Sequence, residues 1–152
     1  MIDIVYKVGD VLEINNTDIC IIIPHICNDM GKWGAGFTGN LSKKSKKPEQ
    51  CYRNNQNNLG EVNIVNIGFN KYIANMIAQH GVRSKINKSP IDYNALEQCL
   101  LRLSTIAKYM KSEIHMPRIG TGFAGGDWNT IENLIIKILC NEDIKVFVYD
   151  LK

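Results

Sequence analysis

A run of apolar residues between Ile19 and His25 constrains the fold of this chain more than any other segment. The run reads Ile-Cys-Ile-Ile-Ile-Pro-His, and a glycine-rich stretch follows it closely. A short, continuous apolar run bounded by turn residues predicts a strand that is buried on both faces. Such a strand needs a sheet with helices packed on each side, so we expect an α/β protein.

The other segments alternate between strand and helix patterns, as a covered sheet requires. Strands are predicted at 2–8, 61–67, 72–79, 114–118 and 144–149, and helices at about 37–44, from Pro48 onward, at 93–110 and at 131–138. Pro48 is expected at the first helical position, and Asp92 is expected to cap the helix that follows it. The chain is therefore predicted to be one α/β domain over 1–152, with a mixed, mostly parallel central sheet and helices on both faces.

Composition and charge exclude several classes of protein. Hydrophobic residues make up 45% of the chain and charged residues 22%, as in ordinary globular proteins. No apolar run reaches the roughly 18 residues that suggest a membrane span, and the N-terminus lacks the pattern of a signal peptide. We therefore expect a cytoplasmic protein with no membrane partner. The net charge of +3 is too small to predict a nucleic-acid partner.

Cysteine and histidine are not arranged as metal ligands. The five cysteines include no Cys-x-x-Cys pair, and the three histidines are scattered. Zinc sites normally show closely spaced pairs of such residues. We therefore expect no metal and no disulfide framework.

Two glycine-rich loops lie where strands are predicted to lead into helices. The first spans 28–37 and includes Gly31, Gly34 and Gly36, and the second spans 120–126. Glycine lets the backbone approach a ligand closely, and the free N–H groups at a helix start bind anions. Together the loops predict a diphosphate held between them. For either loop alone, tight packing without a ligand is the alternative.

Two familiar nucleotide motifs are excluded by their context. Gly120, Gly122 and Gly125 match the spacing of the dinucleotide fingerprint, but only one helix and one strand are predicted after them. That fingerprint normally belongs to the first strand–helix turn of a larger sheet. Neither loop ends in the Gly-Lys-Ser/Thr of a P-loop. A nicotinamide dehydrogenase and a P-loop nucleotidase are thus excluded, and no cofactor is expected.

Four motifs, taken in order, resemble the macro domain family. They are Val8-Gly9-Asp10-Val11-Leu12, His25-Ile26-Cys27-Asn28, Gly31-x-Trp33-Gly34-x-Gly36 and Met116-Pro117-Arg118-Ile119-Gly120-x-Gly122. Their order and spacing match along nearly the whole chain. The chain is most similar in pattern to small stand-alone macro domains, such as the yeast-type ADP-ribose 1″-phosphate phosphatase and, more distantly, the terminal ADP-ribose protein glycohydrolase. The resemblance implies a macro domain that binds ADP-ribose.

The resemblance also implies a role for individual residues. Asp10 would accept a hydrogen bond from the adenine amino group, Val11 would line the base pocket, and Asn28 would hold the distal ribose. The diphosphate and distal ribose would be held by two loops: Gly34, Ala35, Gly36 and Phe37, and then Gly120, Thr121, Gly122, Phe123 and Ala124. Asp10 and Asn28 each have a structural alternative, because these residue types also fix turns and loops.

The same comparison bears on catalysis. The glycohydrolase branch uses a lysine and an aspartate, but Gln79 and Ala124 occupy those positions here, which weighs against that chemistry. The phosphatase-like branch has a histidine where His25 lies. Histidine titrates near neutral pH, so His25 is a candidate general acid or base. A buried, hydrogen-bonded histidine is the alternative.

Further candidates and two functional hypotheses follow. Asn28 would orient the distal ribose for reaction, Asp29 could orient a water, and His80 is a second candidate histidine. The first hypothesis is a phosphatase or hydrolase acting at C1″ of an ADP-ribose derivative. The second is a non-catalytic reader of ADP-ribose or ADP-ribosylated protein. Either hypothesis makes ADP-ribose, one of its derivatives or an ADP-ribosylated protein the expected partner.

Overall fold

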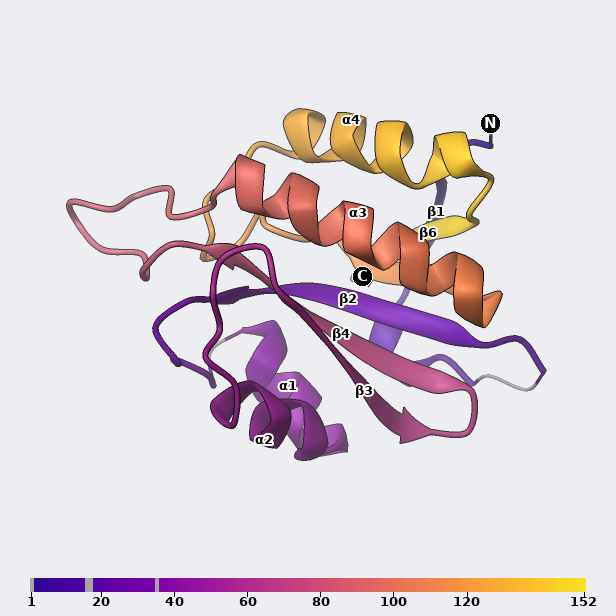
Figure 1. Cartoon of the computed structure of the whole chain (residues 1–152), viewed down its shortest axis with the longest axis horizontal. Helices are drawn as coiled ribbons and strands as arrows, with labels where there is room; N and C mark the ends of the chain where they lie inside the picture. The colour runs from indigo at the N-terminus through magenta and orange to yellow at the C-terminus, as the bar shows by residue number, and fades with distance from the viewer. Residues whose placement is uncertain (1, 16–17, 35) are drawn as a thin grey trace.

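The computed structural model describes residues 2–15, 18–34 and 36–152, which form one six-stranded sheet between two layers of helices (Figure 1). The strands are β1 (Val5–Val8), β2 (Ile21–Asn28), β3 (Val62–Gly68), β4 (Lys71–Gln79), β5 (Glu113–Pro117) and β6 (Val146–Asp150). Their order across the sheet is β1-β6-β5-β2-β4-β3. Only β3 and β4 pair in an antiparallel manner among the described strands. The predicted mixed, mostly parallel sheet is confirmed.

Helices cover both faces of the sheet, as predicted. Helices α3 (Tyr93–Met110) and α4 (Trp128–Ile138) pack on one face, and α1 (Phe37–Lys44) and α2 (Lys47–Arg53) lie on the other (Figure 1). Two short 3-10 turns, η1 (Val11–Glu13) and η2 (Cys140–Glu142), were not predicted. None of the described helices is both long and apolar enough to cross a membrane.

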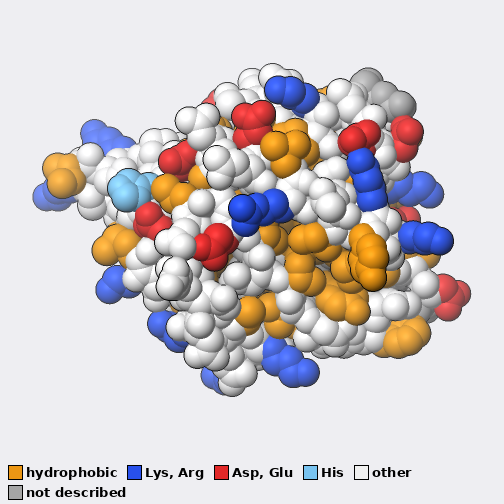
Figure 2. Space-filling view, in the orientation of Figure 1, with side chains coloured by type: hydrophobic (Ala, Val, Ile, Leu, Met, Phe, Trp, Pro, Cys, Tyr) orange, Lys and Arg blue, Asp and Glu red, His pale blue; other side chains and the backbone are white. Residues whose placement is uncertain are grey.

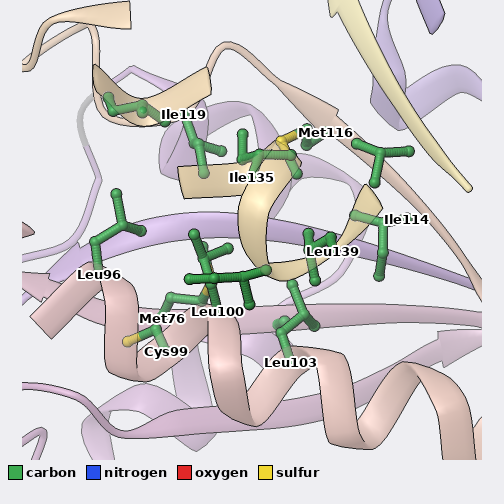
Figure 3. Packing of buried hydrophobic residues seen from close by; sticks show 14 of the residues in the cluster. Met76, Leu96, Cys99, Leu100, Leu103, Ile114, Met116, Ile119, Ile135 and Leu139 are labelled. Atoms are coloured by element: carbon green, nitrogen blue, oxygen red, sulfur yellow. The ribbon is translucent and has the colours of Figure 1, made fainter. Parts of the chain in front are cut away.

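The larger core cluster lies beneath α3 and α4 (Figure 3). Leu96, Leu100 and Leu103 of α3 are fully buried against strand residues such as Met76. Each such leucine contributes about 1.5–3 kcal/mol relative to an exposed position. This cluster fixes α3 and α4 to the sheet and so holds the strand ends on which the site is built.

Strand β2 is buried on both faces, as its apolar run predicts. Ile22 belongs to the cluster beneath α3, whereas Ile21 and Ile23 pack on the opposite face with Leu41 of α1. The two orientations follow from the alternation of side chains along a strand. On the face that Figure 2 shows, basic and acidic side chains are interspersed, which agrees with the small net charge of +3.

Several predicted boundaries were wrong. Strand β2 runs on to Asn28, so His25 lies inside the strand and not at its end. Strand β1 begins at Val5, later than predicted. Pro48 is the second residue of α2, because the helix begins at Lys47.

The predicted start of helix α3 is confirmed. The Asp92 carboxylate accepts a hydrogen bond from the Ala95 N–H at 2.9 Å. Asp127 caps α4 in the same way, accepting from the Thr130 N–H at 3.0 Å. Both caps satisfy N–H groups that a helix start otherwise leaves unpaired.

Candidate functional site

A cavity of about 510 Å³ opens at the carboxyl ends of β2, β4 and β5, and both glycine loops line it. The lining residues from these loops are Asn28, Lys32, Trp33, Gly34, Gly36, Phe37, Gly120, Thr121, Gly122, Phe123 and Ala124. The volume falls within the roughly 300–1,000 Å³ typical of small-molecule sites. Ala35 lies outside the described residues. The structure therefore brings the two loops to one cavity, as their positions after parallel strands require.

The two loops meet at Gly36 and Phe123. Gly36 has a φ of +60°, and a Cβ placed there would lie 3.2 Å from Cε2 of Phe123. The Phe123 side chain is 59% exposed at the cavity mouth. The backbone conformation at position 36 therefore favours glycine, and a Cβ there would require the exposed Phe123 ring to shift by a few tenths of an ångström.

The N-terminus of α1 is better arranged than that of α4 to receive an anion. Gly36 is its N-cap, and no side chain caps its first N–H groups. In α4, by contrast, Asp127 already accepts from the Thr130 N–H. Uncapped N–H groups together with the helix dipole favour a negatively charged ligand group.

Charged residues in the lining favour an anion as well. The lining includes Lys32, Arg83 and Arg118, and it contains no Asp or Glu among the described residues. Arg118 forms two hydrogen bonds with Asp150, at 2.6 and 3.0 Å, so its charge is partly balanced. A cavity lined by cations concentrates anionic ligands.

Asn28 is held in place by the first loop and by a buried tyrosine. Its Oδ1 accepts hydrogen bonds from the Met30 and Lys32 N–H groups at 3.0 and 3.1 Å, and its Nδ2 donates to the Lys32 carbonyl at 2.8 Å. The Tyr52 hydroxyl lies 2.6 Å from the Asn28 carbonyl and 2.8 Å from Oδ1. One amide hydrogen of Asn28 remains for a ligand.

Tyr52 is a supporting residue that sequence reasoning missed. It is fully buried, and burial raises the pKa of its hydroxyl, which stays protonated and able to donate. Its position depends on the docking of α2 against the sheet near Cys27 and Ile77. No local pattern in the sequence signals that contact.

His25 lines the cavity wall, but it is buried and hydrogen-bonded. Its Nε2 lies 2.6 Å from Oδ1 of Asn75, whose Nδ2 donates to the Pro48 carbonyl. This network places a hydrogen on Nε2 and leaves Nδ1 unprotonated. Burial lowers the pKa of His25 to about 4, even though the bond to Asn75 opposes the shift. The ring is therefore neutral near pH 7, with Trp33 and Phe37 packed against it.

Asp29 fixes the start of the loop that follows β4. Its Oδ2 lies 2.7 Å from Nδ1 of His80, and its Oδ1 accepts from the Gly81 N–H at 2.8 Å. Burial alone would raise the pKa of the Asp29 carboxyl, but these two hydrogen bonds outweigh it and the pKa is lowered. The bond to Asp29 raises the pKa of His80. Neither side chain contributes to the cavity lining.

Asp10 and Val11 lie outside the cavity lining. The Asp10 carboxylate accepts from the Leu12 N–H at 2.9 Å and caps η1, and Val11 is buried in the core. The Gly9 N–H donates to the Asp150 carbonyl at 2.8 Å, which ties this turn to the end of β6. No group of three or more His, Cys, Asp or Glu residues in the described part of the chain is arranged to hold a metal.

Comparison with solved structures identifies the family. A macrodomain protein from Streptomyces coelicolor is 36% identical, with a TM-score of 0.83 over 97% of this chain and 99% of that one. A protein from Bacteroides thetaiotaomicron is 42% identical, with a TM-score of 0.90 over 98% of this chain and 100% of that one. No profile of a known protein family matches the chain. The chain belongs to the macrodomain family.

More distant matches share the domain within larger proteins. Chromodomain-helicase-DNA-binding protein 1-like of Mus musculus is 31% identical over 95% of this chain, which spans only 17% of that relative. Thermosipho africanus DarTG, solved in complex with ADP-ribose, matches 86% of this chain and 38% of its own, with a TM-score of 0.69. Its identity is 15%, so the likeness is one of fold.

Proposed function

We propose that this macrodomain binds ADP-ribose in the cavity between the glycine loops and hydrolyses an ADP-ribose derivative at C1″. The observation that carries the proposal is the meeting of both loops at one cavity, with the uncapped start of α1 and no carboxylate in the described lining. Those features suit the two negative charges of a diphosphate. Macrodomains generally bind ADP-ribose, and a related fold was solved with it.

The order of strands supports one orientation of the ligand. The Asp10 turn lies at the edge formed by β1 and β6, whereas Asn28 and Gln79 end the neighbouring strands β2 and β4. The adenine would lie toward Asp10, and the distal ribose would lie toward Asn28. The free amide hydrogen of Asn28 would then donate to a ribose hydroxyl.

The proposed reaction needs little acid–base assistance from the protein. Water attacks C1″, the bond from C1″ to the oxygen of its substituent breaks, and a phosphate or carboxylate departs with the bonding electrons. Such a leaving group is a stable anion and needs no proton from a general acid. The attacking water loses its proton to Nδ1 of neutral His25 or to the departing anion. Positioning by the two loops would supply most of the rate.

A non-catalytic reader is the second candidate. It is favoured by the engagement of Asn28 and Asp29 in hydrogen bonds that organise loops. Gln79 also donates from Nε2 to the Gly81 carbonyl at 3.0 Å and offers no amine for lysine-type chemistry. A reader would use the same cavity but would leave the C1″ substituent intact.

One assay separates the two candidates. The protein is incubated with ADP-ribose 1″-phosphate and with an ADP-ribosyl ester, and released ADP-ribose is followed over time. We expect turnover, slower turnover in His25→Ala with ADP-ribose binding retained, and little change in His115→Ala, a buried histidine outside the cavity lining. Binding without turnover of either compound would favour the reader. Undiminished turnover in His25→Ala would remove His25 from the mechanism.

A further inference from the structure

A projecting loop beside the cavity carries basic and apolar side chains together. We call residues 82–88, between β4 and α3, the rim loop; it extends from the end of the sheet in Figure 1. Its cations are Arg83, Lys85 and Lys88, and no Asp or Glu occurs between 82 and 91. Ile86 is 98% exposed. In Figure 2 blue and orange side chains lie together at this end of the molecule.

The rim loop has a defined internal structure. The Ser84 N–H donates to the Asn87 carbonyl at 3.0 Å, and the Asn87 N–H donates to Oγ of Ser84 at 3.1 Å. The Asn87 side-chain amide donates to the carbonyls of His80 and Val82, each at 3.2 Å. These bonds close the loop into a turn that holds Ile86 at its tip, so the exposure of Ile86 is a feature of the fold.

The rim loop is attached to both glycine loops. At its start, Asp29 after β2 binds the Gly81 N–H at 2.8 Å. Just beyond its end, Oγ of Ser89 donates to the Gly125 carbonyl at 2.6 Å. Val82 and Arg83 themselves line the cavity. The rim loop therefore stands at the end of the cavity where Asn28 and Gln79 lie.

The charges of the rim loop are uncompensated. Within residues 2–15, 18–34 and 36–152, the side chains of Arg83, Lys85 and Lys88 form no hydrogen bond or ion pair, whereas Lys108 pairs with Glu142 at 2.7 Å. Three unpaired cations around an exposed isoleucine match a surface that is acidic and offers an apolar side chain. Such complementarity steers association and selects partners.

We propose that the rim loop binds the acidic polypeptide to which the ADP-ribose is attached at C1″. This proposal rests on the proposed function, because it places C1″ at the rim-loop end of the cavity. A nucleic acid is the less favoured occupant, because proteins usually bind single strands through aromatic stacking and residues 80–91 include no Phe, Tyr or Trp. The substrate class is then an ADP-ribosylated acidic segment of protein.

The test compares three ligands on the whole protein. They are free ADP-ribose, an acidic peptide carrying ADP-ribose through a non-hydrolysable C1″ linkage, and an oligonucleotide carrying the same group. The variant is Lys85→Glu/Ile86→Ser/Lys88→Glu, which leaves the cavity lining unchanged. The matched control is Lys43→Glu/Lys46→Glu/Tyr109→Ser, which alters two exposed lysines and an 89% exposed tyrosine elsewhere.

We expect the unaltered protein to bind the peptide conjugate about tenfold more tightly than free ADP-ribose. This difference in affinity should become smaller as salt is added. The rim-loop variant should bind the peptide conjugate no more tightly than free ADP-ribose, and its affinity for free ADP-ribose should be unchanged. The control variant should still bind the peptide conjugate more tightly. Equal affinity of the unaltered protein for the peptide conjugate and ADP-ribose, or a preference for the oligonucleotide conjugate, would overturn the rim-loop proposal alone. Absence of any ADP-ribose binding would overturn the proposed function with it.

Discussion

The hydroxyl of Tyr52 lies 2.8 Å from Oδ1 of Asn28 and 2.6 Å from its carbonyl oxygen. Asn28, which would hold the distal ribose, is therefore fixed in place by a buried side chain of α2. Asn28 is fixed before any ligand arrives, and a fixed amide loses little conformational entropy on binding.

Removing that hydroxyl should weaken both the fold and the site. In Tyr52→Phe, Asn28 keeps its bonds to the first loop but loses its buried partner, so the free energy of unfolding should fall by about 1 kcal/mol. The affinity for ADP-ribose should also fall modestly, because the Asn28 side chain is then held by the first loop alone. Urea unfolding and calorimetry measure the two effects. Tyr109→Phe, at an 89% exposed position, is the control and should change neither.

A side chain at Gly36 should disturb the contact between the two glycine loops. In Gly36→Ala the new Cβ meets Phe123 at 3.2 Å, and the φ of +60° strains the backbone. Gly31→Ala is the matched control, because Gly31 has a φ of +74° but nothing lies within 4 Å of its Cβ position. Gly31→Ala should lose about 1–2 kcal/mol of stability from strain. Gly36→Ala should lose more, because its φ of +60° with a ψ of −127° lies in the mirror-image extended region that only glycine adopts readily. Only Gly36→Ala should also bind ADP-ribose more weakly. If both variants lost the same affinity for ADP-ribose, that result would contradict a diphosphate site formed by both glycine loops.

Burial of neutral His25 should make stability depend on pH. The pKa of His25 is about 4 in the folded chain, against 6.5 for an ordinary histidine, so the unfolded chain binds more protons between these values. The free energy of unfolding should therefore fall as the pH drops from about 6.5 toward 4, by about 3 kcal/mol. Urea unfolding at several pH values measures this slope.

The variant His25→Gln isolates that contribution. Burial also lowers the pKa of His115, which adds to the slope in the unaltered protein. The slope of His25→Gln should be shallower than that of the unaltered protein but should not vanish. An unchanged slope would mean that folding does not lower the pKa of His25.

Loss of the Asp29 carboxylate should loosen the rim loop. Asp29→Ala removes the acceptor for the Gly81 N–H and the partner of His80. Trypsin, which cleaves after lysine and arginine, should then cut at Arg83, Lys85 or Lys88 faster than in the unaltered protein. Asp29→Asn keeps an acceptor for Gly81 and should show a smaller increase, and Asp3→Ala should show none. Equal cleavage in all four proteins would show that Asp29 does not hold the loop.

The arrangement of the sheet could be predicted because it depends on local patterns. The apolar run at Ile19–His25 predicts a doubly covered strand, and glycine loops that follow parallel strands must face the same edge of the sheet. The end of β2 could not be predicted in this way. Polar His25 and Asn28 continue the strand because Asn75 and Tyr52, distant in sequence, satisfy them in the interior.

The candidate site could be predicted only in part. Glycines indicate where the backbone must turn or approach a ligand. For this reason Gly36 and Gly120 could be predicted from the sequence to line the cavity. Val82 and Arg83 also line it, but their place depends on how Asp29 and Ser89 anchor the loop after β4. The position of such a loop follows from tertiary contacts, which the pattern of its own residues does not encode.

The central claim is that two glycine loops hold the diphosphate of one ADP-ribose molecule. Calorimetric titration of the unaltered protein with ADP-ribose tests it most directly. The account predicts saturable binding of one molecule per chain, weakened strongly in Gly36→Ala and little in Gly31→Ala. Absence of saturable binding, or binding that Gly36→Ala leaves unchanged, would contradict it.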